Sequence, residues 1–240
     1  MKHLPLLAAI ALLIGACSNV QAVPTQTPIV PTAPSTANFR PVAVGQGACL
    51  GVTDPDYTPP ANRPSSYAAP EDQQLDTSKT YCAILTTEKG RIVIQLYPEV
   101  APQHVNSFIF LARQGFYDGT TFHRVIPGFV AQGGDPTGRG DGGPGYRLPL
   151  EVSPLVSYDR VGVVGMARTN DPNSAGSQFF ITYAPVPSLN PSAQSAGYTI
   201  FGQVVEGMDV VERISPRDPS PTAPPGDRLI AVRIVELDAR

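Results

Sequence analysis

An apolar stretch and a stretch of alternating apolar and polar residues are separated by a short turn. The apolar stretch 81–85 leads into Glu-Lys-Gly at 88–90, after which Ile92, Ile94 and Leu96 occupy every other position. Such alternation puts the apolar side chains on one face of a strand. The pattern therefore predicts a hairpin with one buried face.

A period of three to four residues replaces the alternation after residue 101. Pro102 suits the first turn of a helix and Gly115 suits its end. The recurring apolar positions between them are Val105, Phe108, Ile109 and Ala112. We expect a helix here, with His104 as a solvated polar position on it.

Short apolar stretches bounded by Gly and Pro make up the rest of the chain. We expect strands at 121–126, 129–133, 161–167, 178–183, 198–204 and 228–237, and a second short helix at 208–214. Together with the hairpin this gives eight short strands and two helices. That pattern favours a mainly β protein, either a closed antiparallel barrel or a sandwich.

The amino-terminal residues have the composition of a targeting segment. Residues 4–16 follow Lys2 and are small or apolar apart from Pro5, and thirteen residues are too few for a spanning helix, which needs about 20. Residues 1–16 are therefore predicted to be a signal peptide. The end of this segment, Ile-Gly-Ala before Cys17, resembles the lipobox of bacterial lipoproteins.

The lipobox resemblance implies that Cys17 is lipidated and anchors the protein to a bacterial cell membrane, inner or outer, because two or more acyl chains give stable anchoring. An ordinary secretory signal with an incidental cysteine is the alternative. Both interpretations place the mature protein outside the cytoplasm.

Residues 17–79 are rich in Pro, Thr, Ser and Ala and keep no apolar period. We expect them to form a tether, partly polyproline II, from Cys17 to a domain at 80–240. Residues 42–52 are the one stretch that could dock on that domain, through Cys49. In an exported protein Cys49 and Cys82 fit a disulfide, and two unpaired thiols are an equal alternative.

The composition excludes several classes of protein. With 27 Pro and 22 Gly in 240 residues the chain is not mostly helical, and a formal net charge of -3 argues against nucleic-acid binding. After removal of the signal peptide only His104 and His123 remain, without zinc-ligand spacing. No G-x-S-x-G motif marks a nucleophilic serine.

A glycine-rich loop at 138–143 matches G-x-G-x-x-G, but Pro144 follows it instead of a helix. Asp135 and Asp141 are too few ligands for calcium. We therefore interpret the segment as a mobile loop, and we expect no metal and no cofactor.

Residues 122–135, FHRVIPGFVAQGGD, form two predicted strands around a Pro-Gly turn. Alternation puts Phe122 and Arg124 on one face of the first strand. On the second strand it groups Val130 with Gln132 and puts Phe129 opposite. Arg124 is then either a donor inside an apolar groove or a side chain whose stem covers the core while its head is solvated.

This segment and four others resemble the cyclophilins, which are peptidyl-prolyl cis–trans isomerases. The other segments are GFYDGT at 115–120, VGMA at 164–167, GSQFFI at 176–181 and FGQV at 201–204. They occur in the family's order and extend the resemblance over about 80–237. The resemblance implies an eight-stranded antiparallel barrel capped by two helices. It also implies an enzyme that accelerates rotation about X–Pro bonds.

Residue by residue, the resemblance implies that Arg124 is the catalytic arginine and that His123 is structural rather than a base. It implies a substrate-binding groove that grips the proline ring and holds the peptide backbone. The groove residues would be Phe129, Val130, Gln132, Ala167, Arg168, Gln178, Phe180, Leu189 and Tyr198.

The chain departs from the family pattern at the edge of this groove. Ser188 stands where the family has an aromatic residue, so we expect weak cyclosporin binding. Arg168 stands where Asn is common, and the turn before Tyr198 is longer. These departures leave a second hypothesis open, that of a catalytically weak peptide-binding adaptor or chaperone tethered to the membrane.

Either hypothesis predicts the same partners. They are proline-containing segments of exported proteins, with no nucleic acid, with membrane contact only through the lipid anchor, and with a monomeric state.

Overall fold

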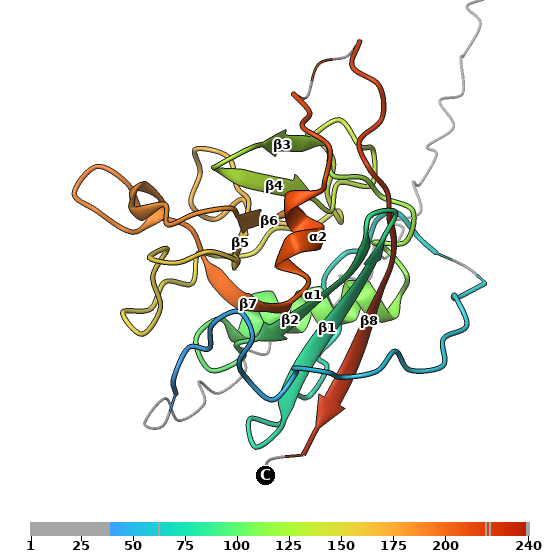
Figure 1. Ribbon diagram of the computed structural model, residues 1–240, viewed down its shortest axis with the longest axis horizontal. Coiled ribbons are helices and arrows are strands. Elements are labelled where there is room, and N and C mark those ends of the chain that lie inside the picture. The colour runs from blue at the N-terminus through green and yellow to red at the C-terminus, as the bar shows by residue number, and fades with distance from the viewer. Residues whose placement is uncertain (1–38, 62, 219, 221, 239–240) are drawn as a thin grey trace, which may run out of the picture.

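The computed structural model describes residues 39–238 except 62, 219 and 221 (Figure 1). The predicted signal peptide and Cys17 lie outside these residues. None of the described helices has both the length and the apolar character that crossing a membrane requires.

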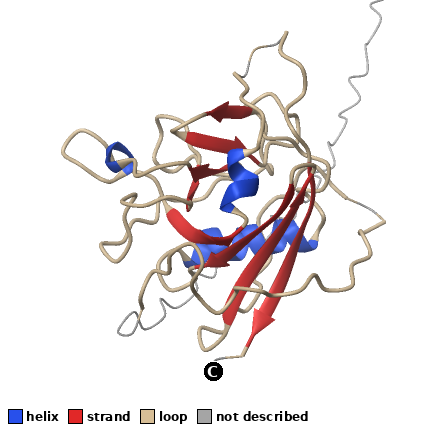
Figure 2. Ribbon diagram, in the orientation of Figure 1, coloured by secondary structure: helices blue, strands red, loops and turns tan. Residues whose placement is uncertain are grey.

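Eight antiparallel strands form one curled sheet, as the sequence predicts (Figures 1 and 2). The strands are β1 Thr80–Thr87, β2 Gly90–Leu96, β3 Arg124–Ile126, β4 Val130–Gly133, β5 Val163–Met166, β6 Phe179–Thr182, β7 Ile200–Glu206 and β8 Leu229–Leu237. Their order is β3-β4-β6-β5-β7-β2-β1-β8. A backbone bridge from Thr121 to Arg228 joins the segments that precede the two edge strands. The strands therefore form a half-barrel, and the bridge brings the segments before β3 and β8 together at its open side. This architecture confirms the prediction of a mainly β protein.

Two helices accompany the sheet, α1 Pro102–Arg113 and α2 Met208–Glu212, with a short 3-10 helix η1 at Pro187–Leu189. The apolar face predicted for α1 is buried, and Phe108 at its centre packs against the rings of Phe179 and Phe201 at 5.7 and 5.2 Å. The helix thus covers one face of the sheet through aromatic contacts.

His104 on α1 is completely buried, contrary to the solvated position expected from the helical pattern. Its Nδ1 lies 2.6 Å from the carboxylate of Glu151, which also accepts hydrogen bonds from the backbone N–H groups of Gln103 and His104. A carboxylate at this place satisfies the unpaired donors of the first helical turn. Glu151 lies far along the chain, so no local pattern could predict this contact.

The β1–β2 hairpin buries both of its faces rather than one. Ala83 pairs with Ile94 and Leu85 with Ile92, and these four side chains belong to the main core. On the other face, Cys82 and Val93 form a second small apolar cluster with Val205 and Cys49. The second face is covered because residues amino-terminal to the domain pack on it.

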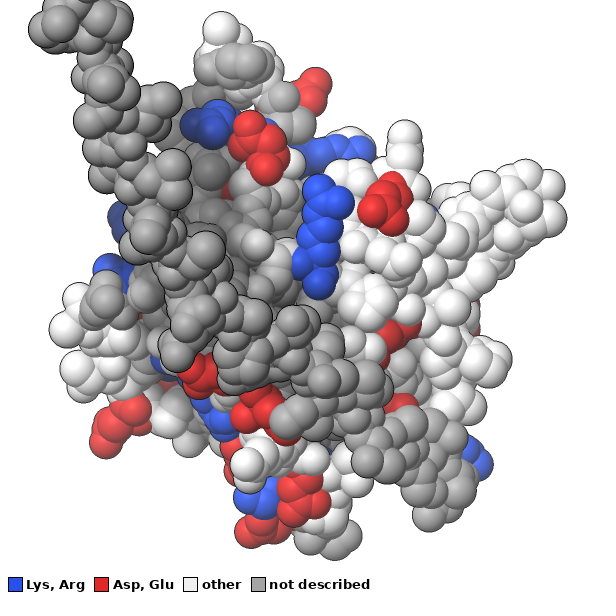
Figure 3. Space-filling model, turned by 180° about the vertical axis from the view of Figure 1, so that it is seen from behind, with Lys and Arg blue, Asp and Glu red and all other residues white. Residues whose placement is uncertain are grey.

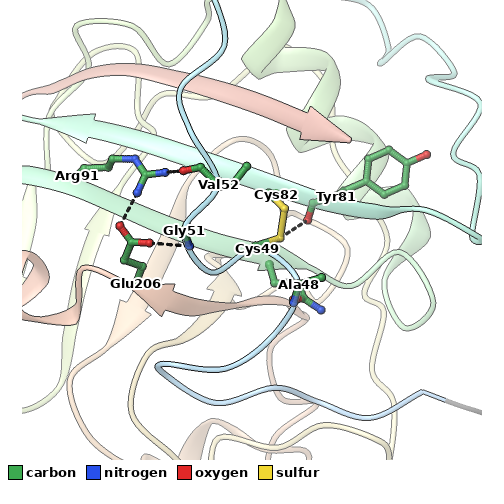
Figure 4. Close-up of a disulfide and its surroundings, with 9 residues drawn as sticks. Ala48, Cys49, Gly51, Val52, Tyr81, Cys82, Arg91 and Glu206 are labelled. Atoms are coloured by element: carbon green, nitrogen blue, oxygen red, sulfur yellow. Dashed lines mark hydrogen bonds and ion pairs between the residues drawn. A yellow bond between two sulfur atoms is a disulfide. The ribbon is translucent and has the colours of Figure 1, made fainter. Parts of the chain in front are cut away.

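Those covering residues, 39–79, are called the strap here. They include residues 42–52, the stretch of the predicted tether that could dock on the domain through Cys49. A disulfide joins Cys49 to Cys82, with the Cα atoms 5.6 Å apart, so the disulfide alternative is the correct one. The N–H of Gly45 donates to the carbonyl of Val205 at 2.8 Å. Figure 4 shows the disulfide on β1 beside the ion pair of Arg91 with Glu206.

The strap cannot build a core of its own, yet it buries apolar groups against the domain. Cys49 is fully buried, and Val42 packs against both apolar clusters. In Figure 1 the strap is the blue-to-cyan trace that crosses the hairpin and continues around the molecule. On the face shown in Figure 3, acidic and basic side chains are intermixed and gather in no large patch of one sign.

Candidate active site

One groove collects the side chains that the sequence singles out. A cavity of about 290 Å³ is lined by Arg124, Phe129, Val130, Gln132, Ala167, Arg168, Phe180, Leu189 and Tyr198. The remaining predicted residue, Gln178, lines an adjoining hollow and contacts Gln132. The structure therefore brings the ten predicted residues together, although the role of each remains a prediction.

Strand register explains how three of these residues meet. Arg124 on β3 lies opposite Gln132 on β4, and Gln132 lies opposite Phe180 on β6. Side chains directly opposite each other in an antiparallel pair point to the same face of the sheet. An arginine, an amide and an aromatic ring thus stand in a row across three strands.

Alternation misplaced the two phenylalanines of this segment. Phe129 lines the groove together with Val130 and Gln132, although alternation puts it on the opposite face. Phe122 is fully buried against Phe179, whereas Arg124 lines the groove. Both residues precede their strands, where the two-residue period does not hold.

Arg124 is held by a relay of amide side chains. Its Nη1 donates to Oε1 of Gln132 at 3.4 Å, and Nε2 of Gln132 donates to Oε1 of Gln178 at 3.0 Å. Nε2 of Gln178 donates in turn to the carbonyls of Gly140 and Gly142 at 3.0 and 2.8 Å. Arg124 forms no ion pair with any residue in the described part of the chain, so most of its five donors stay available to a ligand.

The apolar end of the groove has a rigid floor. Phe180 stacks on the buried ring of Tyr158 at 5.8 Å and meets Tyr198 edge-on at 5.9 Å. Gly165 lies behind these rings, where an added Cβ would come within 2.5 Å of Phe180 and 2.2 Å of the Tyr158 hydroxyl. Glycine is therefore required at 165. Tyr158 is a supporting residue that the sequence pattern did not reveal.

Arg168 and Tyr198 form the wall beside Phe180. The guanidinium carbon of Arg168 lies 4.4 Å from the centre of the Tyr198 ring. Its nitrogens donate to the carbonyl of Gly197 at 2.8 and 2.9 Å and to that of Thr169 at 2.8 Å. Ser188 is exposed and does not line the groove. The arginine and the tyrosine thus form one wall of the groove.

Replacing Arg168 by alanine is expected to raise the KM for a proline peptide about five- to thirtyfold. The variant loses a cation–π contact and hydrogen bonds that hold the wall, each worth about 1 kcal/mol. Steady-state isomerisation kinetics measure this change. Ser188→Ala is the matched control and should behave as wild type, and an Arg168→Ala variant with unchanged KM would contradict this role.

Asp135 organises the glycine-rich loop, which is ordered rather than free. Its buried carboxylate accepts hydrogen bonds from the backbone N–H groups of Thr137 at 2.6 Å and Gly142 at 3.0 Å, and also from Gly140. Burial alone would raise the pKa of Asp135, but these hydrogen bonds outweigh burial and lower it. Within the described ranges, no three His, Cys, Asp or Glu residues gather as metal ligands would.

His123 lies next to Arg124 and is buried. Burial lowers its pKa, and the nearby Asp135 offsets part of that effect. The ring is therefore neutral at pH 7. Its Nδ1 has no hydrogen-bond partner among the described residues, which fits the structural role predicted for it.

Comparison with known proteins agrees with this arrangement. Residues 81–237 match the family model described as "Cyclophilin type peptidyl-prolyl cis-trans isomerase/CLD". A peptidyl-prolyl cis-trans isomerase of Helicobacter pylori is 40% identical over 150 residues, which cover 62% of this chain and 88% of that protein. A peptidyl-prolyl cis-trans isomerase of Synechococcus elongatus is 43% identical over 153 residues, which cover 64% of this chain and 95% of that protein.

A solved structure gives the same result for the fold. A Cryptosporidium parvum cyclophilin-type isomerase, crystallised in the presence of the dipeptide Ala-Pro, superposes with a TM-score of 0.58 at 35% identity. The superposition covers 64% of this chain and 98% of that one. The half-barrel with its apolar groove is thus the scaffold of an enzyme that isomerises X–Pro bonds. The chain belongs to the cyclophilin-type peptidyl-prolyl cis–trans isomerases.

Proposed function

We propose that the groove catalyses isomerisation by stabilising the twisted X–Pro amide through Arg124. Rotation about this bond faces a barrier of about 18–20 kcal/mol because of amide resonance. No bond to a heavy atom forms or breaks, so neither a nucleophile nor an acid–base pair is required. The site must only bind the twisted amide more strongly than either planar isomer.

One observation carries the assignment of this role to Arg124 rather than to Arg168. Both guanidinium groups line the groove. Each packs on an aromatic ring, Arg168 on Tyr198 at 4.4 Å and Arg124 on Phe129 at 5.7 Å. Arg168 also donates to the carbonyls of Gly197 and Thr169, whereas the guanidinium of Arg124 makes one hydrogen bond among the described residues, of 3.4 Å to Gln132. Arg168 thus uses three of its five N–H donors on backbone carbonyls, whereas Arg124 uses one and keeps four for a ligand.

In the twisted amide the prolyl nitrogen becomes pyramidal and gains a lone pair, which can accept a hydrogen bond from Arg124. A preorganised donor is most effective where water is excluded. Phe129, Val130 and Phe180 supply the apolar surface that grips the proline ring and excludes water. The decisive test is the isomerisation rate of a short Xaa-Pro peptide with the full chain and with Arg124→Ala.

The test has two outcomes, which distinguish an active isomerase from a peptide-binding adaptor. Fast turnover that collapses in the variant supports the mechanism. Peptide binding without turnover by the wild type would instead make the chain a binding adaptor, the alternative that the departures at the groove edge suggest.

We further propose that the protein acts outside the cytoplasm, as a monomer anchored through lipidated Cys17, on proline-containing segments of exported proteins. The Cys49–Cys82 disulfide supports this location, because disulfides persist in oxidising compartments. The signal-like segment 1–16 and the lipobox-like residues before Cys17 support it independently.

Replacing Cys17 by serine is expected to abolish membrane attachment in bacteria that express the full chain. The variant loses the sulfur that carries the first acyl chains, and one chain alone gives only marginal binding. Labelling with a radioactive fatty acid and fractionation of membranes measure the effect. Ser18→Ala is a matched control that should stay labelled. A Cys17→Ser variant that still carries label would contradict the anchor.

A further inference from the structure

The strap touches the edge of the groove through a direct backbone contact. The N–H of Tyr67 donates to the carbonyl of Pro144 at 2.7 Å. Gly145 lies against the strap so closely that an added Cβ would come within 2.2 Å of Ser66 Oγ and 2.7 Å of the Tyr67 carbonyl. The strap therefore lies directly behind residues 144–145, which line the hollow beside the groove.

Tyr67 is anchored by packing and not by its hydroxyl. Its ring meets Phe110 of α1 edge-on at 5.0 Å and lies 6.3 Å from Phe116. The hydroxyl is buried without a hydrogen-bond partner in the part of the chain that the structure describes. The aromatic ring thus fixes the strap to α1 at the place where its backbone holds Pro144.

The other side of the same loop faces the hollow beside the groove. Residues 140–147 line a polar hollow of about 460 Å³, which shares Gln132, Ala167 and Arg168 with the apolar groove. A peptide whose proline occupies the groove can continue over Ala167 and Arg168 into this hollow. The position of the loop therefore decides how well the extended part of the peptide fits.

Both ends of the segment that carries Tyr67 are fixed to the domain. The Cys49–Cys82 disulfide closes a loop of chain with a sequence separation of 33 residues, and Tyr67 lies near its middle. The strap lies outside residues 81–237, the part of the chain that matches the family model.

We propose that the strap contributes to peptide binding by supporting one side of the binding site, and that Tyr67 is the positioning residue through which it does so. It holds the loop at 140–147 from behind and so raises the affinity of the hollow for peptides that extend beyond the proline. The proposal rests on the groove being a peptide site, as proposed above. Tyr67 touches the loop at Pro144 and Gly145, whereas the relay that holds Arg124 ends at Gly140 and Gly142. We therefore expect Tyr67 to act on KM and not on kcat.

The experiment compares Tyr67→Ala with Tyr67→Phe in the full chain. Each protein is assayed with a tetrapeptide and with a nonapeptide that carries its proline in the centre, at a temperature well below its Tm. For Tyr67→Ala we expect the KM of the nonapeptide to rise about three- to tenfold, the KM of the tetrapeptide to change less, and kcat to stay within about twofold. Tyr67→Phe should match the wild type, because it removes only an unpaired hydroxyl.

Two results would overturn the proposal. In the first, Tyr67→Ala lowers Tm but leaves the KM values of both peptides unchanged, which would mean that the strap only stabilises the fold. In the second, Tyr67→Ala lowers kcat equally for both peptides, which would mean that Tyr67 does not act through the binding of the extended peptide. The dissociation constant of the nonapeptide is also measured for each protein by calorimetry, which does not require turnover. If the wild type binds the nonapeptide without isomerising it, the proposed isomerase function fails. The effect of Tyr67→Ala on peptide affinity can then still be compared with that of Tyr67→Phe.

Discussion

Replacing Arg124 by alanine is expected to lower kcat/KM for Xaa-Pro isomerisation about 10²- to 10³-fold, the usual cost of removing a preorganised transition-state donor. The side chain is only partly buried and makes one long hydrogen bond, to Gln132, so little structure depends on it. We therefore expect Tm to change by no more than a few degrees. Peptide isomerisation kinetics and thermal unfolding monitored by circular dichroism measure the two effects separately.

Arg124→Lys is the matched control for charge. Lysine keeps the positive charge but lacks the planar arrangement of donors, so we expect an intermediate rate. A lysine variant as active as wild type would show that charge alone suffices. An alanine variant with nearly normal turnover would exclude Arg124 from the chemistry.

Removing the disulfide by Cys49→Ala together with Cys82→Ala is expected to lower the free energy of unfolding by about 3–4 kcal/mol, because the unfolded chain regains the freedom of a long closed loop. Both cysteines are fully buried in the cluster with Val93 and Val205. Urea unfolding followed by fluorescence gives the difference.

Alanine is chosen because serine would add buried hydroxyl groups to an apolar cluster. The double serine variant, measured beside it, should be less stable than the double alanine variant because of that added cost. An oxidised wild type no more stable than the double alanine variant would show that the strap holds without the covalent bond.

Local sequence patterns predicted the regular elements well because short-range physics decides them. The alternation of Ile92, Ile94 and Leu96 lies within β2, and the helical spacing between Pro102 and Gly115 corresponds to α1. The same patterns failed just outside the strands, at Phe122 and Phe129. There the chain bends, and its periodicity no longer reports which way a side chain points.

The contacts that could not be predicted join residues far apart in the sequence. The carboxylate of Glu151 contacts the imidazole of His104, the ring of Tyr158 stacks on Phe180, and the backbone of Tyr67 contacts Pro144. Composition predicted a tether at 17–79 because Pro- and Thr-rich segments rarely build a core, with docking considered for 42–52 alone. It could not show that the strap would also pack on the domain beyond that stretch, as Tyr67 does on Phe110.

The candidate groove was assembled from a family resemblance, and the structure brings its residues together. What the resemblance could not supply was the relation between one departure and its neighbour. Arg168 is a departure from the family pattern, and the structure places its guanidinium on the ring of Tyr198. The wall they form depends on both residues at once.

The turn between Leu189 and Tyr198 is closed at its base, where the N–H of Tyr198 donates to the carbonyl of Leu189 at 3.1 Å. Asn190 is fixed by the N–H of Tyr158, and Gly197 by Arg168, while residues 191–194 are exposed. Because its ends are tied together, this turn can gain or lose residues during evolution without displacing the groove. It is therefore the natural place to insert a short tag or a fluorescent reporter beside the bound peptide.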